Sequence, residues 1–107
     1  MISDAQFQEL LAAYEKHGWQ LRMLVLEDVR QAPEGLSRDV SVNNGIVNAA
    51  WFSRPPSSGP NAWEIRSLGG TQYALVEHLD EEAPDFEQRL QQTEQRLAAA
   101  LESKRTA

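Results

Sequence analysis

Apolar residues recur at helical spacing near the start of the chain, at Phe7, Leu10, Leu11 and Tyr14. The i, i+3, i+4, i+7 spacing places these side chains on one face of an α-helix. Ser3 and Gln6 have the spacing of a capping box, which satisfies backbone N–H groups at the start of a helix. Gly18 follows as the glycine expected just beyond a helix C-terminus. The pattern therefore predicts a helix over residues 4–17.

The pattern changes to alternation after this helix. Apolar side chains occupy every second position at Trp19, Leu21, Met23 and Val25, which predicts one face of a β-strand. The segment 40–52 predicts two short strands joined by a tight hairpin, because Asn43-Asn44-Gly45 favours the positive φ angles of such a turn.

A second hairpin is predicted over residues 62–79, with Gly69-Gly70 as a two-residue turn. This turn pairs Leu68 with Thr71, and Trp63 with Val76. In this register, one face carries Trp63, Ile65, Ala74, Val76 and His78. The opposite face carries Glu64, Arg66, Leu68, Tyr73, Leu75 and Glu77. Trp63 is therefore expected to be a core residue.

The last part of the chain returns to helical spacing. Acidic residues and Pro84 gather at 80–87, which suits the first turn of a helix. An apolar stripe follows at Phe86, Leu90, Leu97 and Leu101. The pattern predicts a final helix over roughly 85–103.

In order, these elements predict an α+β fold: an antiparallel sheet of three to five strands, flanked by an N-terminal and a C-terminal helix (α-β-β-β-(β)-α). A chain of 107 residues is expected to form one domain. We place this domain at 1–104 and a short polar tail at 105–107.

Composition narrows the classes of function. The formal net charge of −6 leaves little counterion release to gain at a phosphate backbone, so nucleic acid is disfavoured as a partner. The chain has no cysteine, which excludes disulfides, thiolate metal sites and a cysteine nucleophile. No apolar run approaches the ~20 residues of a membrane helix, and the first residues do not form a secretory signal. We expect a soluble cytoplasmic protein without cofactor, metal or membrane partner.

The second face of the predicted sheet is less polar than a solvated face should be. It combines Leu24, Leu26, Leu68, Tyr73 and Leu75 with Arg22, Glu64 and Arg66. Either the C-terminal helix covers this face or a second protomer does, because contiguous exposed apolar area on a small monomer marks an interface. We expect a homodimer that uses this face or the final helix.

Aromatic and cationic residues surround the Pro-, Ser- and Gly-rich segment between Trp51 and Arg66. Assigning its flanks to strands leaves a connecting loop at about 54–61. Guanidinium groups recognise carboxylates and phosphates well. The alternative is that the arginines pair with Glu64, with Glu77 or with a partner chain. The candidate binding residues are Trp51, Arg54, Arg66, Glu64, Tyr73 and Arg22.

A helix followed by three strands, with Glu64-Ile65-Arg66 on a central strand, resembles the core of the PD-(D/E)xK nucleases. The resemblance covers about half of the chain, through Arg66, and rests on a short motif. It implies a divalent metal held by Glu64 and by an Asp of the preceding strand, with a lysine that positions water. Asn48 stands where that Asp belongs, and Arg66, which stays charged, stands in place of the lysine. A cross-strand pair of charged side chains explains the same residues.

No catalytic or metal motif of useful specificity occurs in the sequence. We therefore expect a small non-enzymatic interaction module that self-associates and recognises a protein or a small ligand. The alternative is an enzyme of unrecognised class, including a degenerate nuclease-like fold, with Glu64, Arg66 and His78 as its best candidates. Convergence of these three side chains in one concave pocket would favour the enzyme.

Overall fold

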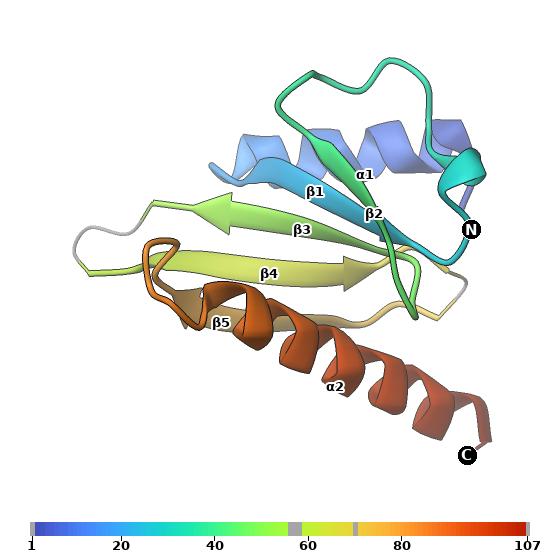
Figure 1. The fold of residues 1–107 in the computed structure, drawn as a ribbon. Helices are drawn as coiled ribbons and strands as arrows, with labels where there is room; N and C mark the ends of the chain where they lie inside the picture. Colours follow the sequence, from blue (N-terminus) through green and yellow to red (C-terminus); the bar gives the residue numbers. More distant parts are fainter. Residues whose placement is uncertain (1, 56–58, 70, 107) are drawn as a thin grey trace.

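The computed structural model describes residues 2–55, 59–69 and 71–106, with side chains through 104. Within these residues, a five-stranded sheet carries one long helix on each face (Figure 1). In chain order the elements are α1 (Asp4–Lys16), β1 (Gln20–Leu26), the short 3-10 helix η1 (Val29–Gln31), β2 (Ser41–Asn44), β3 (Ala49–Arg54), β4 (Asn61–Ser67), β5 (Ala74–Leu79) and α2 (Phe86–Thr106). The predicted α+β class is confirmed, with a mostly antiparallel sheet between an N-terminal and a C-terminal helix.

The N-terminal helix α1 begins as the sequence predicts. The backbone N–H of Gln6 donates to the Ser3 hydroxyl at 3.2 Å, and the Ser3 N–H donates to the Gln6 side-chain oxygen at 3.0 Å. The capping box is therefore formed. The helix ends at Lys16, one residue before the predicted end, and Gly18 turns the chain with a φ of +84°.

The strands lie in the order β2-β1-β3-β4-β5. Neighbouring strands from β1 through β5 pair antiparallel, whereas β2 pairs with β1 in parallel. The hairpin predicted over residues 40–52 is therefore wrong, because β1 lies between its two strands.

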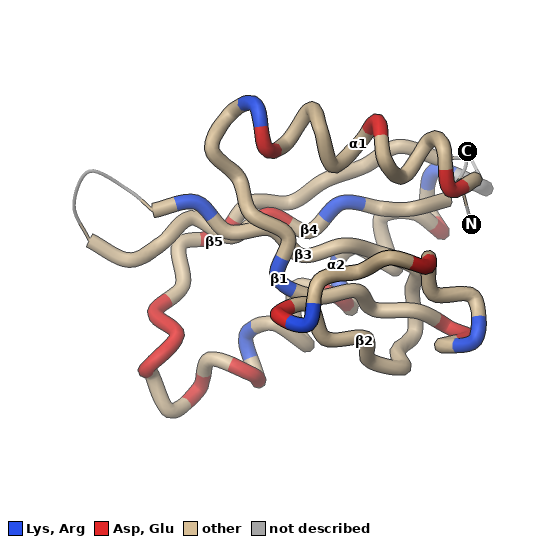
Figure 2. Tube along the Cα trace, turned by 90° about the horizontal axis from the view of Figure 1, so that it is seen from above, with Lys and Arg blue, Asp and Glu red and all other residues tan. Residues whose placement is uncertain are grey.

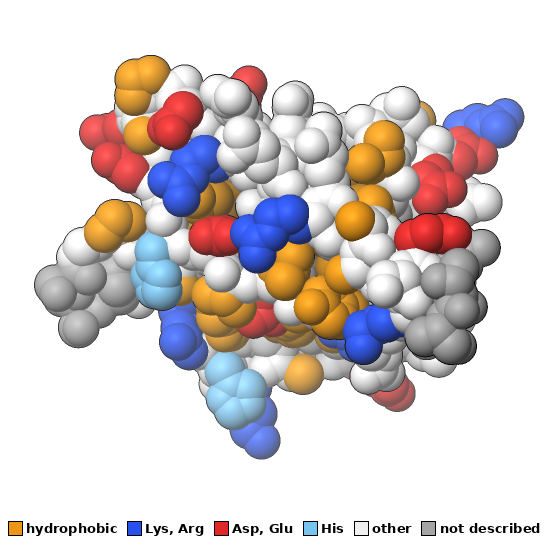
Figure 3. Space-filling model, turned by 90° about the horizontal axis from the view of Figure 1, so that it is seen from below, with side chains coloured by type: hydrophobic (Ala, Val, Ile, Leu, Met, Phe, Trp, Pro, Cys, Tyr) orange, Lys and Arg blue, Asp and Glu red, His pale blue; other side chains and the backbone are white. Residues whose placement is uncertain are grey.

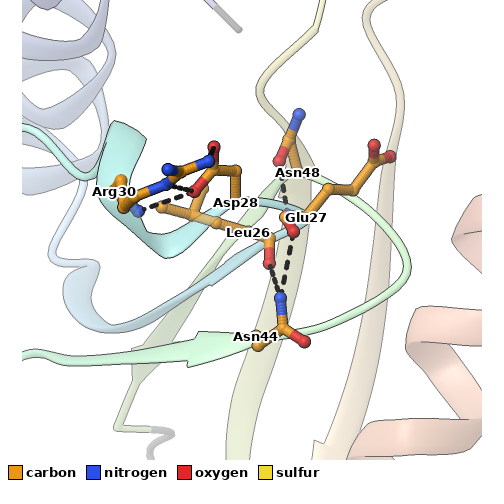
Figure 4. A network of polar contacts seen from close by, with 6 residues as sticks. All are labelled: Leu26, Glu27, Asp28, Arg30, Asn44 and Asn48. Carbon is orange, nitrogen blue, oxygen red and sulfur yellow. Dashed lines mark hydrogen bonds and ion pairs between the residues drawn. The ribbon is translucent and has the colours of Figure 1, made fainter.

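Contacts at the end of β2 explain why this segment lies along β1. The side-chain amide of Asn44 donates to the carbonyl oxygens of Leu26 at 3.3 Å and Glu27 at 3.0 Å (Figure 4). The N–H of Gly45 also donates to the Leu26 carbonyl, at 2.9 Å. Gly45 passes so close to β1 that a Cβ there would lie 2.4 Å from Cγ1 of Val25. Asn44 and Gly45 thus fasten β2 to β1, and Gly45 lacks the positive φ that a tight hairpin needs.

Strand β5 is displaced by one residue from the predicted register. Trp63 lies opposite Glu77, whereas the prediction placed it opposite Val76. A shift of one residue moves every side chain of a strand to the other face of the sheet. The predicted faces of β5 are therefore wrong: Tyr73 and Leu75 pack on the same side as Trp63.

The connection between β4 and β5 accounts for the shift. The N–H of Ser67 donates to the Tyr73 carbonyl at 2.9 Å, and the Ser67 hydroxyl donates to the Thr71 carbonyl at 2.7 Å. Leu68 is fully buried on the α1 side, and its N–H donates to the Asn48 carbonyl at 2.9 Å. Leu68 therefore leaves the strand pair before the predicted turn. Residue 70 of that turn lies outside the described residues.

The two long helices cover opposite faces of the sheet, and they cover different parts of it (Figure 1). The cluster beneath α2 includes buried residues of β1, β3, β4 and β5, among them Val25, Trp51, Trp63, Ile65 and Leu79. The cluster beneath α1 draws on β1, β3 and the segment before β2, and includes Phe7, Leu24, Leu26, Phe52 and Leu68. The apolar second face expected from the sequence is therefore covered over β1 and β3 by α1, not by α2.

An irregularity in β1 changes the predicted alternation of its side chains. The pairing with β3 shifts between Leu21 and Met23. As a result, Leu21 packs with the α1 cluster, while Met23 packs with the α2 cluster. A β-bulge has this effect because it adds one residue to one strand of the pair.

The C-terminal helix α2 runs from Phe86 to Thr106, past the predicted end at 103. Its predicted apolar stripe faces the sheet, with Leu90 and Leu97 buried. The tail predicted at 105–107 begins within this helix; residue 107 and the side chains at 105 and 106 lie outside what the structure describes.

Candidate functional site

On its α1-facing side, the β5 end of the sheet lies beyond the cover of helix α1. The cluster beneath α1 contains no described residue of β5. The strand pairing places Ala62, Glu64 and Arg66 of β4 beside His78, Val76 and Ala74 of β5. We call these six residues the β4–β5 strip. Ala74 and His78 are exposed, and Val76 is 52% exposed.

The backbone of β5 is open along the same residues. The N–H of Ser67 donates to the Tyr73 carbonyl, so the residues in phase with Tyr73 direct their backbone groups toward β4. Ala74, Val76 and His78 are the alternate residues, and their backbone N–H and C=O groups point away from β4, toward the open edge of the sheet. The described part of β5 has neither lysine nor proline, the residues that usually protect an edge strand. The same three residues of β5 therefore combine exposed side chains with backbone groups that face the open edge of the sheet.

Charged side chains border the strip at fixed positions. The Tyr14 hydroxyl of α1 donates a hydrogen bond to the Glu64 carboxylate. Burial, and then this hydrogen bond to Glu64, raise the pKa of Tyr14 well above its usual range, so the hydroxyl remains a donor. The Arg66 guanidinium donates to the carbonyl of Ser67 at 2.8 Å. Figure 3 views the molecule from below, where hydrophobic side chains gather with charged side chains of both signs around them.

Arg54 and Trp19 form a separate hollow at the end of α1. The Arg54 guanidinium lies 4.7 Å from the centre of the Trp19 ring and donates to the His17 carbonyl at 3.4 Å. Ala13 and Tyr14 complete the lining of this hollow, whose volume is about 320 Å³. The predicted candidate Arg54 is thus on the α1 side but apart from the strip.

Three predicted candidates lie on the α2 side instead. Arg22 forms two hydrogen bonds with the Glu81 carboxylate, both at 2.9 Å, and its guanidinium lies over the ring of Trp63. The hydrogen bond from Arg22 lowers the pKa of Glu81. Glu81 belongs to the acidic segment that links β5 to α2 (Figure 2). The expectation that Arg22 shares a face with Arg66 is therefore wrong.

Trp51 and Tyr73 are the other two candidates on that side. Trp51 is fully buried, and its indole N–H donates to the Glu94 carboxylate at 3.0 Å. Burial raises the pKa of Glu94, and the hydrogen bond from Trp51 opposes this shift. The Lys104 ammonium lies 5.1 Å from the centre of the Tyr73 ring. Trp51 is thus a core residue like Trp63.

Of the predicted site residues, only Glu64 and Arg66 lie in the strip. Sequence reasoning missed Ala74 and Val76 as surface residues because the predicted register turned them toward the core. The signal that could have located them is Leu68. It is apolar and in phase with Glu64 and Arg66, which favours a place in the core beneath α1 over a place in a tight turn beside the glycines.

The residues of the suggested nuclease motif are spread along the strip. Arg66 lines a hollow beside Ile2 and Leu10, and neither Glu64 nor His78 lines that hollow. The Asn48 side-chain oxygen accepts a hydrogen bond from the Glu27 N–H at 2.9 Å. In residues 2–55, 59–69 and 71–104, no group of three or more His, Cys, Asp or Glu side chains is placed to hold a metal ion.

Comparison with protein families, with curated proteins and with solved structures found no match to this chain. Among the described residues, no helix has the length and apolar character needed to cross a bilayer.

Proposed function

We propose that this protein is a non-enzymatic interaction module that binds an extended segment of polypeptide along the open edge of β5. The observation that carries the proposal is the coincidence of outward backbone groups and exposed small apolar side chains at Ala74 and Val76. An added strand satisfies such backbone groups through main-chain hydrogen bonds and places alternate side chains on the strip.

The arrangement of Glu64, Arg66 and His78 supports binding rather than catalysis. A catalytic group needs a reacting atom within hydrogen-bond reach of several converging side chains. Glu64 is instead bonded to Tyr14, Arg66 is bonded to Ser67, and His78 lies at the far end of β5 from Arg66. These positions suit the charged border of an apolar contact surface.

Photo-cross-linking at β5 tests this proposal. A benzophenone amino acid at position 76, activated in cells of the source organism, should give a discrete adduct. The same group at position 46 is the matched control, because Ile46 is also an exposed aliphatic residue, at 61% exposure. A second change, His78→Pro, should abolish the adduct, because it removes one outward N–H that an added strand would bond. The fold should survive this change, since proline is tolerated on the open side of an edge strand.

The melting curve of the His78→Pro variant shows whether the fold is kept. Absence of an adduct at position 76, or equal adducts at positions 46 and 76, would overturn the proposed function.

A further inference from the structure

The sequence of β5 is able to pair with itself, and the strip limits how it can do so. In an antiparallel dimer with its two-fold axis perpendicular to the sheet, each side chain lies opposite a side chain of the second copy that points to the same face. Because side chains alternate between faces, the axis must then pass next to one residue of β5 and its own copy, not between two successive residues. Axes beside Leu75, Val76 and Glu77, three interior positions of β5, define three registers.

Two of these registers bring unfavourable pairs together. An axis at Glu77 places Glu77 opposite the same carboxylate of the second copy, and like charges directly opposite are destabilising. An axis at Val76 places Leu75 opposite Glu77 of the second copy. On the strip, this axis also aligns Val76 of both copies in one row across the joined sheet. Because Glu64 lies beside Val76, that row ends in a Glu64 carboxylate on each side.

The third register, with the axis at Leu75, matches chemistry on both faces. Leu75 then lies opposite Leu75 of the second copy, and Val76 lies opposite Ala74, so the centre is apolar. On the strip, Arg66 lies beside Ala74 and Glu64 beside Val76, so each row ends in opposite charges. On the α2 side, Glu77 lies opposite Tyr73, whose ring carries the Lys104 ammonium.

We infer that the partner bound at β5 is a second copy of this chain, paired antiparallel about Leu75 to give one continuous sheet. This inference rests on the proposed function, because it names the segment that occupies the edge. Each copy satisfies the outward backbone groups of the other, and the two strips become one surface on the same side of the joined sheet.

Cysteine cross-linking tests the register on a clean background, because the chain contains no cysteine. Opposite residues whose backbone groups face each other in an antiparallel pair have Cα atoms about 5.5 Å apart, a distance common in disulfides. Under mild oxidation, a mixture of the variants Ala74→Cys and Val76→Cys should form a disulfide-linked heterodimer. Neither variant alone should cross-link efficiently. Efficient cross-linking of Val76→Cys alone would place the axis at Val76 and overturn the register.

Light scattering tests the assembly itself. The wild type should have twice the mass of the 12.0 kDa chain. Val76→Lys should raise the dissociation constant about tenfold or more, because a lysine on an edge strand opposes pairing. Ile46→Lys is the matched control for an added charge at an exposed aliphatic position and should keep the dimer.

The outcomes separate this inference from the proposed function. A wild type that stays monomeric up to ~1 mM, the range of weak encounters, overturns the inference. If position 76 then cross-links to a protein of another mass, the proposed function stands; if it gives no adduct, both fail.

Discussion

The two ends of the sheet are open on opposite faces, and the two openings differ in chemistry. At the β2 end, on the α2 side, a hollow of about 290 Å³ is lined mostly by polar side chains, among them Asn43, Asn44, Gln91 and Glu94. At the β5 end, on the α1 side, the opening carries Ala74 and Val76. The Asn44 amide is engaged by β1, whereas the outward backbone groups of β5 have no bond within the described residues. The opening at the β2 end is therefore mainly polar, whereas the opening at the β5 end is apolar.

The largest expected effect comes from the core beneath α2, next to the β2 opening, because Trp51 bonds to Glu94 in the lining of that opening. Trp51→Ala should lower the free energy of unfolding by about 3–5 kcal/mol, because it removes a fully buried ring and leaves a cavity beneath α2. Urea unfolding measures the loss. Trp19→Ala is the matched control, since Trp19 is partly exposed, and it should cost clearly less. Equal losses would show that Trp51 does not anchor the core beneath α2.

Gly45→Ala should have the next largest effect. Its Cβ would lie 2.4 Å from Val25 Cγ1, and relieving such overlap costs about 1–3 kcal/mol. Gly69→Ala serves as control, because a Cβ at Gly69 meets no atom within 4 Å. Thermal unfolding compares the two variants. A Gly45→Ala protein as stable as the control would mean that β2 is held loosely against β1.

These positions also show what the sequence could predict. The helices were predictable because their signals are local: Ser3 and Gln6 form the cap, and Leu90 and Leu97 form the stripe. The parallel pairing of β2 was not predictable, because it depends on the Asn44 amide reaching carbonyl groups seventeen and eighteen positions earlier in the chain. The strip was missed for a related reason. The N–H of Leu68 bonds to Asn48 instead of to β5, and Ser67 bonds to Tyr73. The register of β5 is therefore shifted by one residue, which exchanges the faces of Val76 and Leu75.

A smaller effect is expected at Glu94, and it depends on pH. Burial raises the pKa of Glu94 above its ordinary value near 4.5, so the folded state holds this proton more tightly than the unfolded state. Its contribution to stability is therefore lost as the pH rises from about 4.5 through the folded pKa. Glu94→Gln keeps an acceptor for the Trp51 indole and should remove this part of the pH dependence.

Urea unfolding at pH 4.5 and pH 7 measures the Glu94 effect. The exposed Glu87→Gln, two turns earlier on α2, controls for the loss of one negative charge. Identical pH profiles for the two variants would contradict the role of burial at Glu94.

The smallest effect on folding is expected at the β5 opening. Val76→Thr keeps a branched side chain suited to a strand and should change the free energy of unfolding of the monomer by no more than about 0.5 kcal/mol. The same substitution should weaken self-association, because it introduces a hydroxyl group opposite Ala74. Ile46→Thr should change neither quantity. A large loss of monomer stability in Val76→Thr would show that the strip is part of the core.

The position of β1 between β2 and β3 has a consequence for the order of folding. Strands β3, β4 and β5 are consecutive in the chain and adjacent in the sheet, so their contacts close short loops. β1 pairs with residues more distant along the chain on both sides, and such contacts form slowly. We expect a transient species in which the three-stranded meander has formed and β1 has not yet docked. In that species β3 is a second unpaired edge, so premature association would join the wrong strands, and rapid docking of β1 protects the yield of folded protein.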